Sequence, residues 1–241
     1  MTKLLLKLVL LFVAISYGLW KLSASTEFQL FGELIHKVDT DQKLVALTFD
    51  DGPTPHYTAG VLQLLELYQV KATFFVTGAE TQRYMTQAKQ IVAAGHQLGN
   101  HSWSHPRMLF MSLDEINREI ESTDQQIRAA GFEGDILFRP PYGKKLVLLP
   151  WYLAQTDRTS IMWDIAPETF DEETEDPQTM AAEVLEQVQP GSIVLLHLMY
   201  KNREASRAAL PIIIKGLKAK GYTMVKVSDL LAAQKQATVE Q

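Results

Sequence analysis

The feature that most constrains this chain is a regular alternation of strand-like and helix-like segments over about 190 residues. Runs rich in β-branched and aromatic residues predict strands, and apolar residues three and four apart predict helices. The predicted strands are residues 44–49, 72–76, 135–138, 160–163, 192–196 and 222–225, and the predicted helices are residues 57–68, 81–94, 112–130, 178–187 and 205–220. Such alternation favours a parallel sheet with helices outside, and leaves open whether that sheet is open or closed.

The first 25 residues form a separate segment. Lys3 and Lys7 precede an apolar run over residues 8–20, and a small-residue patch follows at residues 23–25. This pattern is typical of an export signal, with cleavage possible after Ser25. Residues 4–20 could instead remain as an uncleaved membrane anchor, at the short end of the length that spans a bilayer. Either way, the following domain is expected to be periplasmic, secreted or held on the outer side of the cytoplasmic membrane.

The remaining chain is expected to form one domain. Residues 26–42 read as a connector with a short strand, residues 43–233 as the catalytic domain, and residues 234–241 as a tail. The net charge is -5 with both signs interspersed, so no nucleic-acid partner is expected. The chain has no cysteine, which excludes disulfides and thiolate metal ligands.

Five polar motifs lie at or near the ends of predicted strands. They are T-F-D-D-G-P at 48–53, H-S-W-S-H at 101–105, R-P-P-Y-G at 139–143, W-D-I-A-P-E-T-F at 163–170 and I-V-L-L-H at 193–197. In β/α folds the chemistry gathers at the carboxyl ends of the strands. The placement of the motifs therefore predicts one active site at that edge.

The first two motifs contain the residue types of a catalytic metal site. Asp50 and Asp51 offer two adjacent carboxylates, and His101 and His105 offer two imidazoles. Two neutral imidazoles and one carboxylate are a common ligand set for a divalent metal, zinc by default, with cobalt, manganese and nickel as alternatives. The second carboxylate would be free to act as a base on the water. Taken alone, the Asp-Asp-Gly-Pro string is an ordinary turn.

In these motifs the chain resembles the polysaccharide deacetylases of carbohydrate esterase family 4. Four of the family motifs are matched, by T-F-D-D-G-P, H-S-W-S-H, R-P-P-Y-G and L-L-H. The sequence between the family motifs is matched as well, by V-K-A-T-F-F-V-T-G at 70–78 and G-H-Q-L-G-N-H at 95–101. The resemblance covers residues 43–231. It implies a distorted (β/α) barrel of about seven units and a metal-dependent hydrolase.

The resemblance also implies a role for each motif residue. The metal would be held by Asp51, His101 and His105, and the catalytic residues would be Asp50, Arg139, Tyr142 and His197. Asp50 would act as the base, with Arg139 favouring its ionised form. The backbone N–H of Tyr142 would stabilise the oxyanion, and His197 would protonate the departing amine.

The substrate contacts are expected to come from four residues: Leu195, Trp103, Trp163 and Phe170. Leu195 would line the pocket for the acetyl methyl. The tryptophan side chains would line the sugar groove, although Trp163 could equally belong to the core.

The fourth motif departs from the family pattern. Thr169-Phe170 stands where the family commonly has Asp-Trp, whose carboxylate orients the acid histidine and whose ring forms a groove wall. Phe170 would replace the wall. Asp164, Glu168 or Asp171 would replace the carboxylate.

The expected activity is removal of N-acetyl groups from N-acetylglucosamine units of an extracytoplasmic polysaccharide, such as peptidoglycan, an exopolysaccharide or chitin oligomers. A second hypothesis is an O-acetyl esterase acting on a glycan such as acetyl-xylan. A third is a membrane-anchored glycan-binding protein without catalysis, and a fourth is a hydrolase of non-sugar amides. The complete set of motif residues argues against the binding protein.

Overall fold

A parallel sheet forms the centre of the domain. The structure, a computed structural model, describes residues 2–168 and 176–237. The sheet contains β2 (Leu44–Asp50), β3 (Thr73–Val76), β4 (Gln97–Asn100), β6 (Ile193–His197) and β7 (Thr223–Val225). Their order is β4-β3-β2-β6, and β7 pairs with the start of β2. All residues of β2 after Leu44 are buried, as expected for a parallel strand that is covered on both faces.

Short pairings close the sheet into a distorted barrel. Phe138 bridges Asn100 on one side and Ser160 on the other, and Ile165 bridges Val194 of β6. The segment that contains β5 (Ser160–Ile161) therefore connects β4 back to β6, while β1 (Leu34–Ile35) pairs with β5. The barrel expectation is confirmed. The predicted strand at 135–138 is wrong, because only Phe138 pairs and it does so as an isolated bridge.

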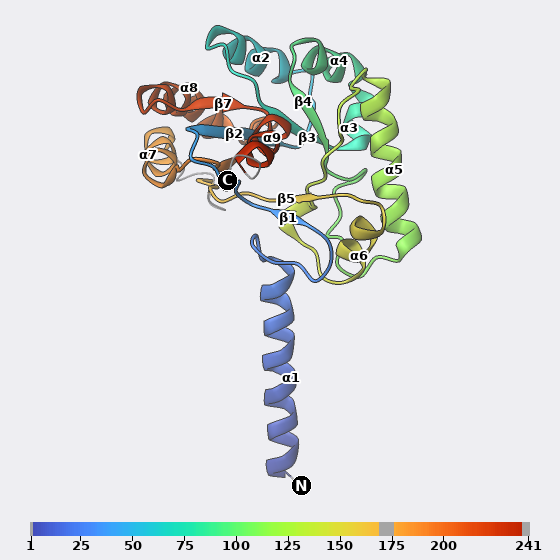
Figure 1. Cartoon of the computed structure of the whole chain (residues 1–241). Helices are drawn as coiled ribbons and strands as arrows, with labels where there is room; N and C mark the ends of the chain where they lie inside the picture. Colours follow the sequence, from blue (N-terminus) through green and yellow to red (C-terminus); the bar gives the residue numbers. More distant parts are fainter. Residues whose placement is uncertain (1, 169–175, 238–241) are drawn as a thin grey trace.

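Helices cover the sheet, as Figure 1 shows. They are α2 (Thr58–Leu67), α3 (Gly78–Arg83), α4 (Met85–Ala93), α5 (Leu113–Ala129), α6 (Leu148–Gln155), α7 (Pro177–Gln187), α8 (Glu204–Ala219) and α9 (Val227–Ala237). The sequence carries a capping-box pattern at Ser112 and Glu115, at the start of the predicted helix 112–130, and the structure forms this capping box at the start of α5. The main core lies between β2, β3 and β6 and the apolar faces of α2, α4, α7 and α8.

The predicted helix at 81–94 is two helices. Tyr84 has φ −121° and ψ 45°, outside the helical region, and so separates α3 from α4. Neither α6 nor α9 was predicted. Pro150 in α6 reads as a helix breaker, but it lies in the first turn, where its missing N–H costs no hydrogen bond.

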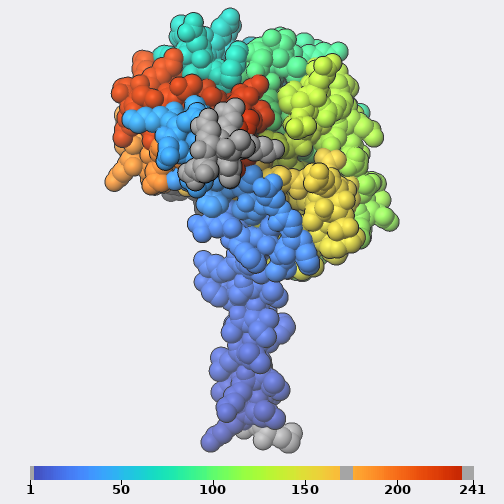
Figure 2. All heavy atoms as spheres, viewed as in Figure 1, coloured from blue at the N-terminus to red at the C-terminus, as the bar shows by residue number. Residues whose placement is uncertain are grey.

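The N-terminal helix α1 (Thr2–Ser23) projects away from the domain (Figures 1 and 2). Residues 3–21 are exposed. Its apolar stretch has a mean hydropathy of 1.8 and is long enough to cross a membrane. At 1.5 Å per residue the helix extends about 33 Å, close to the thickness of a bilayer core. These properties suit both an export signal and an anchor.

Candidate active site

The two carboxylates at the end of β2 face different partners. Asp50 is the last residue of β2, and its Oδ1 accepts a 2.7 Å hydrogen bond from Nη1 of Arg139. Asp51 has φ +73°, and its N–H donates to the carbonyl of Phe75. This left-handed residue turns the chain sharply. Asp51 Oδ1 consequently lies 3.6 Å from Nε2 of His105, away from the arginine.

Asp51, His101 and His105 converge on one point. Each offers a ligand atom, and these atoms all lie within 4.8 Å of one another. The loop after β4 brings the two imidazoles together, since Ser102 and His105 both have positive φ. Within that loop the Asn100 side chain accepts from the Ser102 N–H, and the Ser102 hydroxyl accepts from the His105 N–H. The three predicted ligands are thus adjacent in space.

The hydrogen bonding of His101 leaves one ring nitrogen available to a metal. Its Nδ1 lies 2.7 Å from the carbonyl oxygen of Arg139. Because a carbonyl only accepts, Nδ1 must carry the proton, and Nε2 keeps its lone pair. Burial lowers the pKa of both His101 and His105 despite the nearby carboxylates. Both imidazoles are therefore neutral, as metal ligation requires.

The charge balance of the site also fits a cation. Burial raises the pKa of Asp51, and the charges of Asp50 and Glu80 add to that rise. Arg139 already pairs with Asp50, whereas within residues 2–168 and 176–237 Asp51 has no ion pair with a lysine or arginine and lies beside the neutral His105. A divalent ion held by Asp51, His101 and His105 would supply the missing positive charge. The donor set thus fits a divalent metal.

Arg139 holds Asp50 in its ionised form. Its side chain is completely buried, and Nη1 also bonds the Thr48 hydroxyl. Nε and Nη2 donate to the carbonyls of Ile161 and Met162, in and next to β5. Burial alone would raise the pKa of Asp50, but the charge and hydrogen bond of Arg139, together with the nearby imidazoles of His101 and His197, lower the pKa. An ionised carboxylate in this position can accept a proton.

His197 stands beside Asp50 across the sheet, since β2 and β6 pair in register with Asp50 opposite His197. Its Nδ1 lies 2.5 Å from Oε2 of Glu168. The other oxygen of Glu168 accepts 2.6 Å bonds from the His197 N–H and the Ser206 hydroxyl. Burial opposes the charged imidazolium, yet the bond and charge of Glu168 raise the pKa of His197 to about 9. The ring therefore carries a proton near neutral pH, as a general acid must.

Glu168 is thus the carboxylate that contacts His197, in the place of the Asp that the fourth motif lacks. Of the three carboxylates considered, Asp164 instead accepts from the Ser192 hydroxyl and the Ile193 N–H, where it fixes the start of β6. The predicted groove wall Phe170, together with Thr169 and Asp171, lies outside the described residues.

Tyr142 lies beside His105, one of the three predicted metal ligands. It has φ +57° inside the 3-10 turn η1 (Pro141–Gly143), so its ring projects from a tight corner and stays half exposed. The centre of this ring is 4.5 Å from that of His105 and 4.4 Å from the Arg107 guanidinium. The predicted role rested on the backbone N–H, and the structure adds a side-chain contact with a ligand.

The remaining predicted contacts divide into two groups. Leu195 precedes His197 by two residues on β6, so both side chains point to the same face of the strand. Trp163 lies beside Arg139, whose guanidinium is 5.6 Å from the centre of the Trp163 ring. Trp103 lies in the loop between His101 and His105, and its half-buried ring packs on Gly78 at the start of α3.

Sequence reasoning missed a carboxylate behind Asp51. Glu80 Oε2 accepts from the Gly52 N–H at 2.9 Å, the Thr77 hydroxyl and the Tyr200 hydroxyl. It therefore ties the turn after Asp51 to the start of α3 and to the segment after β6. Its position four residues after β3 was a usable signal, because the main site residues also follow strand ends.

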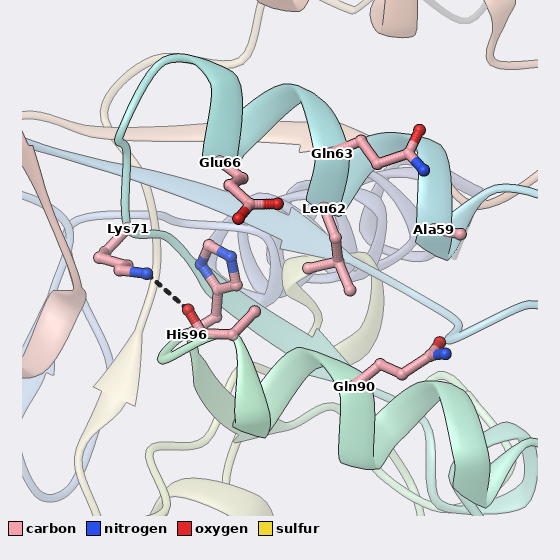
Figure 3. Close-up of a pocket in the computed structure, with 8 residues that line it drawn as sticks. Ala59, Leu62, Gln63, Glu66, Lys71, Gln90 and His96 are labelled. Atoms are coloured by element: carbon pink, nitrogen blue, oxygen red, sulfur yellow. Dashed lines mark hydrogen bonds between the residues drawn. The ribbon is translucent and has the colours of Figure 1, made fainter.

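A surface hollow between α2 and α4 is unrelated to this site. Figure 3 shows it lined by polar side chains such as Lys71, which bonds the Ala94 carbonyl, and by His96. His96 lies at the amino ends of β3 and β4, opposite the end that carries Asp50. Its Nδ1 accepts from the Ala72 N–H, and burial lowers its pKa to about 4. It is a neutral histidine with a structural hydrogen bond.

Comparison with known proteins accounts for this arrangement. A model of the polysaccharide deacetylase family matches residues 37–161. The chain belongs to this family. Similar proteins include a peptidoglycan-N-acetylglucosamine deacetylase of Bacillus cereus, 32% identical over 85% of this chain and 96% of the relative. The peptidoglycan-N-acetylmuramic acid deacetylase PdaC of Bacillus subtilis is 36% identical over 83% of this chain, which spans 41% of PdaC.

Solved structures with the same fold include both a deacetylase and a pseudoenzyme. A structure of PdaC matches with a TM-score of 0.73 over 84% of this chain and 96% of that chain. A pseudoenzyme of carbohydrate esterase family 4 from Bacillus anthracis matches equally well, with a TM-score of 0.73 and 30% identity over 83% of this chain and 69% of that chain. The fold therefore does not guarantee catalysis, which depends on the site residues.

Proposed function

We propose that this protein is a metal-dependent hydrolase that removes N-acetyl groups from N-acetylglucosamine units of an extracytoplasmic polysaccharide, with peptidoglycan as the first candidate. The observation that carries the proposal is a complete site. A base held ionised by Arg139 and an acid held protonated by Glu168 lie on neighbouring strands beside a three-residue metal site. Amide hydrolysis needs these groups together, because water must lose a proton and the amine must gain one.

Each residue has a distinct task in this proposal. Asp51, His101 and His105 hold the metal, which when bound supplies Lewis acidity toward the acetyl oxygen and a water molecule. Asp50 accepts the proton of the attacking water, and His197 donates a proton to the leaving nitrogen. The backbone N–H of Tyr142 donates a hydrogen bond to the developing oxyanion.

The substrate contacts are proposed from position. Leu195 shares the strand face of His197, so it lines the space for the acetyl methyl. Trp163, beside Arg139, forms one wall of the sugar groove. Trp103 is held against Gly78 and contributes to the groove only through its exposed edge. Phe170 stays a proposed wall.

The choice of sugar and metal follows from the relatives and the donor set. The relatives are named for both N-acetylglucosamine and N-acetylmuramic acid, so peptidoglycan is the shared polymer. Zinc is the proposed ion, because two imidazoles and one carboxylate suit it best. Manganese, cobalt and nickel are the next candidates. The apolar helix α1 supports a location outside the cytoplasmic membrane.

The deciding experiment is acetate release by the full chain in detergent. Peptidoglycan, N-acetylglucosamine oligomers and acetyl-xylan are offered, each with chelator and with chelator followed by zinc. Zinc-dependent acetate from peptidoglycan supports the proposal, and mass spectrometry of the digested glycan then identifies the deacetylated sugar. Release from acetyl-xylan alone would replace it with an O-acetyl esterase. Bound zinc and glycan without any acetate would replace it with a glycan-binding protein.

A further inference from the structure

The C-terminal end of α1 packs against the domain and is hydrogen-bonded to it. Ser23 is almost completely buried, and its carbonyl accepts a 2.8 Å bond from the Lys145 N–H. The Lys145 ammonium donates to the carbonyl of Ser25 at 2.5 Å. The Lys144 ammonium lies 3.7 Å from the centre of the Trp20 ring and 3.4 Å from the Ser23 hydroxyl. The helix thus meets the domain through a packed, hydrogen-bonded junction.

Lys145 depends on residues that an export cleavage would remove. Its side chain is 1% exposed, and burial lowers its pKa to about 8. Its ammonium donates to the Ser25 carbonyl, and its backbone N–H donates to the Ser23 carbonyl. Cleavage after Ser25 would remove the acceptor of the Lys145 ammonium and the acceptor of its backbone N–H, and leaving buried donors unpaired is costly. Both hydrogen bonds of Lys145 therefore require that Ser23 and Ser25 stay attached to the domain.

An apolar surface adjoins this junction. It consists of six partly exposed side chains, called here the basal surface: Phe28, Leu30, Phe31, Val147, Leu148 and Trp151. The segment after α1 lies against α6, because a Cβ added at Gly32 would come within 3.1 Å of the Ala154 Cβ. Figure 1 shows that this segment and α6 form the end of the domain from which α1 projects.

We propose that α1 is a retained membrane anchor and that the basal surface rests on the outer leaflet of the same bilayer. The helix is long and apolar enough to span, and Lys3 and Lys7 keep its start in the cytoplasm. A bilayer crossed by α1 begins where the basal surface lies. Aromatic and aliphatic side chains with nearby lysines suit the interface between lipid headgroups and acyl chains.

This arrangement couples the anchor to catalysis. Lys144 and Lys145 follow η1 directly, and η1 carries Tyr142 beside His105. The loop over the active site and the anchor are therefore fixed to each other by a few bonds. The enzyme would act on glycan within a short, constant distance of the membrane surface and leave distant layers of the polymer untouched. This last consequence rests on the proposed function.

Retention of α1 is tested on the full chain expressed in a bacterium. Intact-mass spectrometry of the membrane fraction is expected to show a protein that contains residues 2–25, and washing with alkaline carbonate is expected to leave it in the membrane. A soluble product that begins at Thr26, or anywhere within residues 21–33, would overturn the proposal. Neither readout depends on deacetylase activity, so failure here is separate from failure of the proposed function.

Contact of the basal surface with lipid is tested by fluorescence quenching. The full chain with Trp20→Phe is reconstituted in phosphatidylethanolamine–phosphatidylglycerol vesicles that carry bromine near the headgroups. Most of the quenching is expected to disappear when Trp151→Phe is added, and the matched control Trp103→Phe is expected to change it little. Equal quenching in both variants, or none at all, would show that the basal surface does not touch the bilayer and would refute this part of the proposal.

Discussion

Replacing Glu168 by Gln tests how His197, the proposed general acid, is kept protonated. The pKa of His197 is raised from 6.5 to about 9 against the opposing effect of burial, first by the hydrogen bond and charge of Glu168 and then by the charges of Asp50 and Asp51. The amide of Gln keeps the size of the side chain and one hydrogen-bond acceptor but removes the negative charge. We therefore expect the pKa of His197 in the variant to return to 6.5 or below.

The size of the effect follows from the two pKa values. At pH 8 a group with a pKa of about 9 is about 90% protonated, whereas a group with a pKa of 6.5 is about 3% protonated. Turnover that needs the acid should therefore fall about 30-fold at pH 8 and less than about twofold at pH 6. In the plot of kcat against pH, the fall in kcat at high pH should occur at a pH about 2.5 units lower in the variant than in wild type.

The assay is acetate release from N-acetylglucosamine oligomers between pH 5 and 10, with wild type and variant at equal metal occupancy. Equal occupancy matters because a bound cation offsets the charges of Asp50 and Asp51, which also raise the pKa of His197. Ser206→Ala is the matched control, since it removes a bond to Glu168 but leaves the charge. A basic limb at the same pH in Glu168→Gln and wild type would refute the reasoning.

The same pair predicts how stability depends on pH. Because the folded-state pKa of His197 is raised, its contribution is fully present below pH 6.5 and is lost as the pH rises through about 9. A shift of this size corresponds to about 3 kcal/mol in the free energy of unfolding. Urea titrations of the metal-free protein should show this loss in wild type and a flatter curve in Glu168→Gln.

Three further outcomes are expected. Asp50→Asn should reduce turnover at least about 100-fold yet retain zinc by metal analysis, whereas Asp51→Asn should lose both, and the reverse pattern would exchange their roles. A chelator should abolish acetate release, and zinc should restore it in wild type but not in Asp51→Asn. Gly78→Ala should lower the free energy of unfolding by about 1–3 kcal/mol in urea titrations, because a Cβ there would lie 2.4 Å from the Trp103 ring and 3.1 Å from the α5 backbone. Gly60→Ala, with open space around it, is the control.

Local sequence patterns determined much of this protein. The alternation of segments predicted a parallel sheet with helices outside, and the capping box of Ser112 located the start of α5. The placement of polar motifs at strand ends predicted one active site at that edge, and the family resemblance assigned its metal ligands as Asp51, His101 and His105, which do lie together. These features depend on residue spacing and on the rule that parallel strands share a carboxyl edge, so they can be read from the chain alone.

Such patterns did not predict how the barrel closes or where α3 ends and α4 begins. The barrel closes through single bridges at Phe138 and Ile165, which are too short to leave a periodic signal. Tyr84 breaks a helix whose sequence reads as continuous. In both places the packing of neighbouring elements overrides local propensity.

Which group completes the site was decided by tertiary structure. Three carboxylates near the fourth motif were chemically equivalent candidates, and only the path of the chain brings Glu168 to His197, 29 residues away. The chain likewise brings Arg139 to Asp50 across 89 residues, and Lys145 to Ser25 across 120. The sequence supplies the types of group and their order. The partner of each group depends on how the ring of strands closes, because that closure sets which distant residues lie within hydrogen-bonding distance.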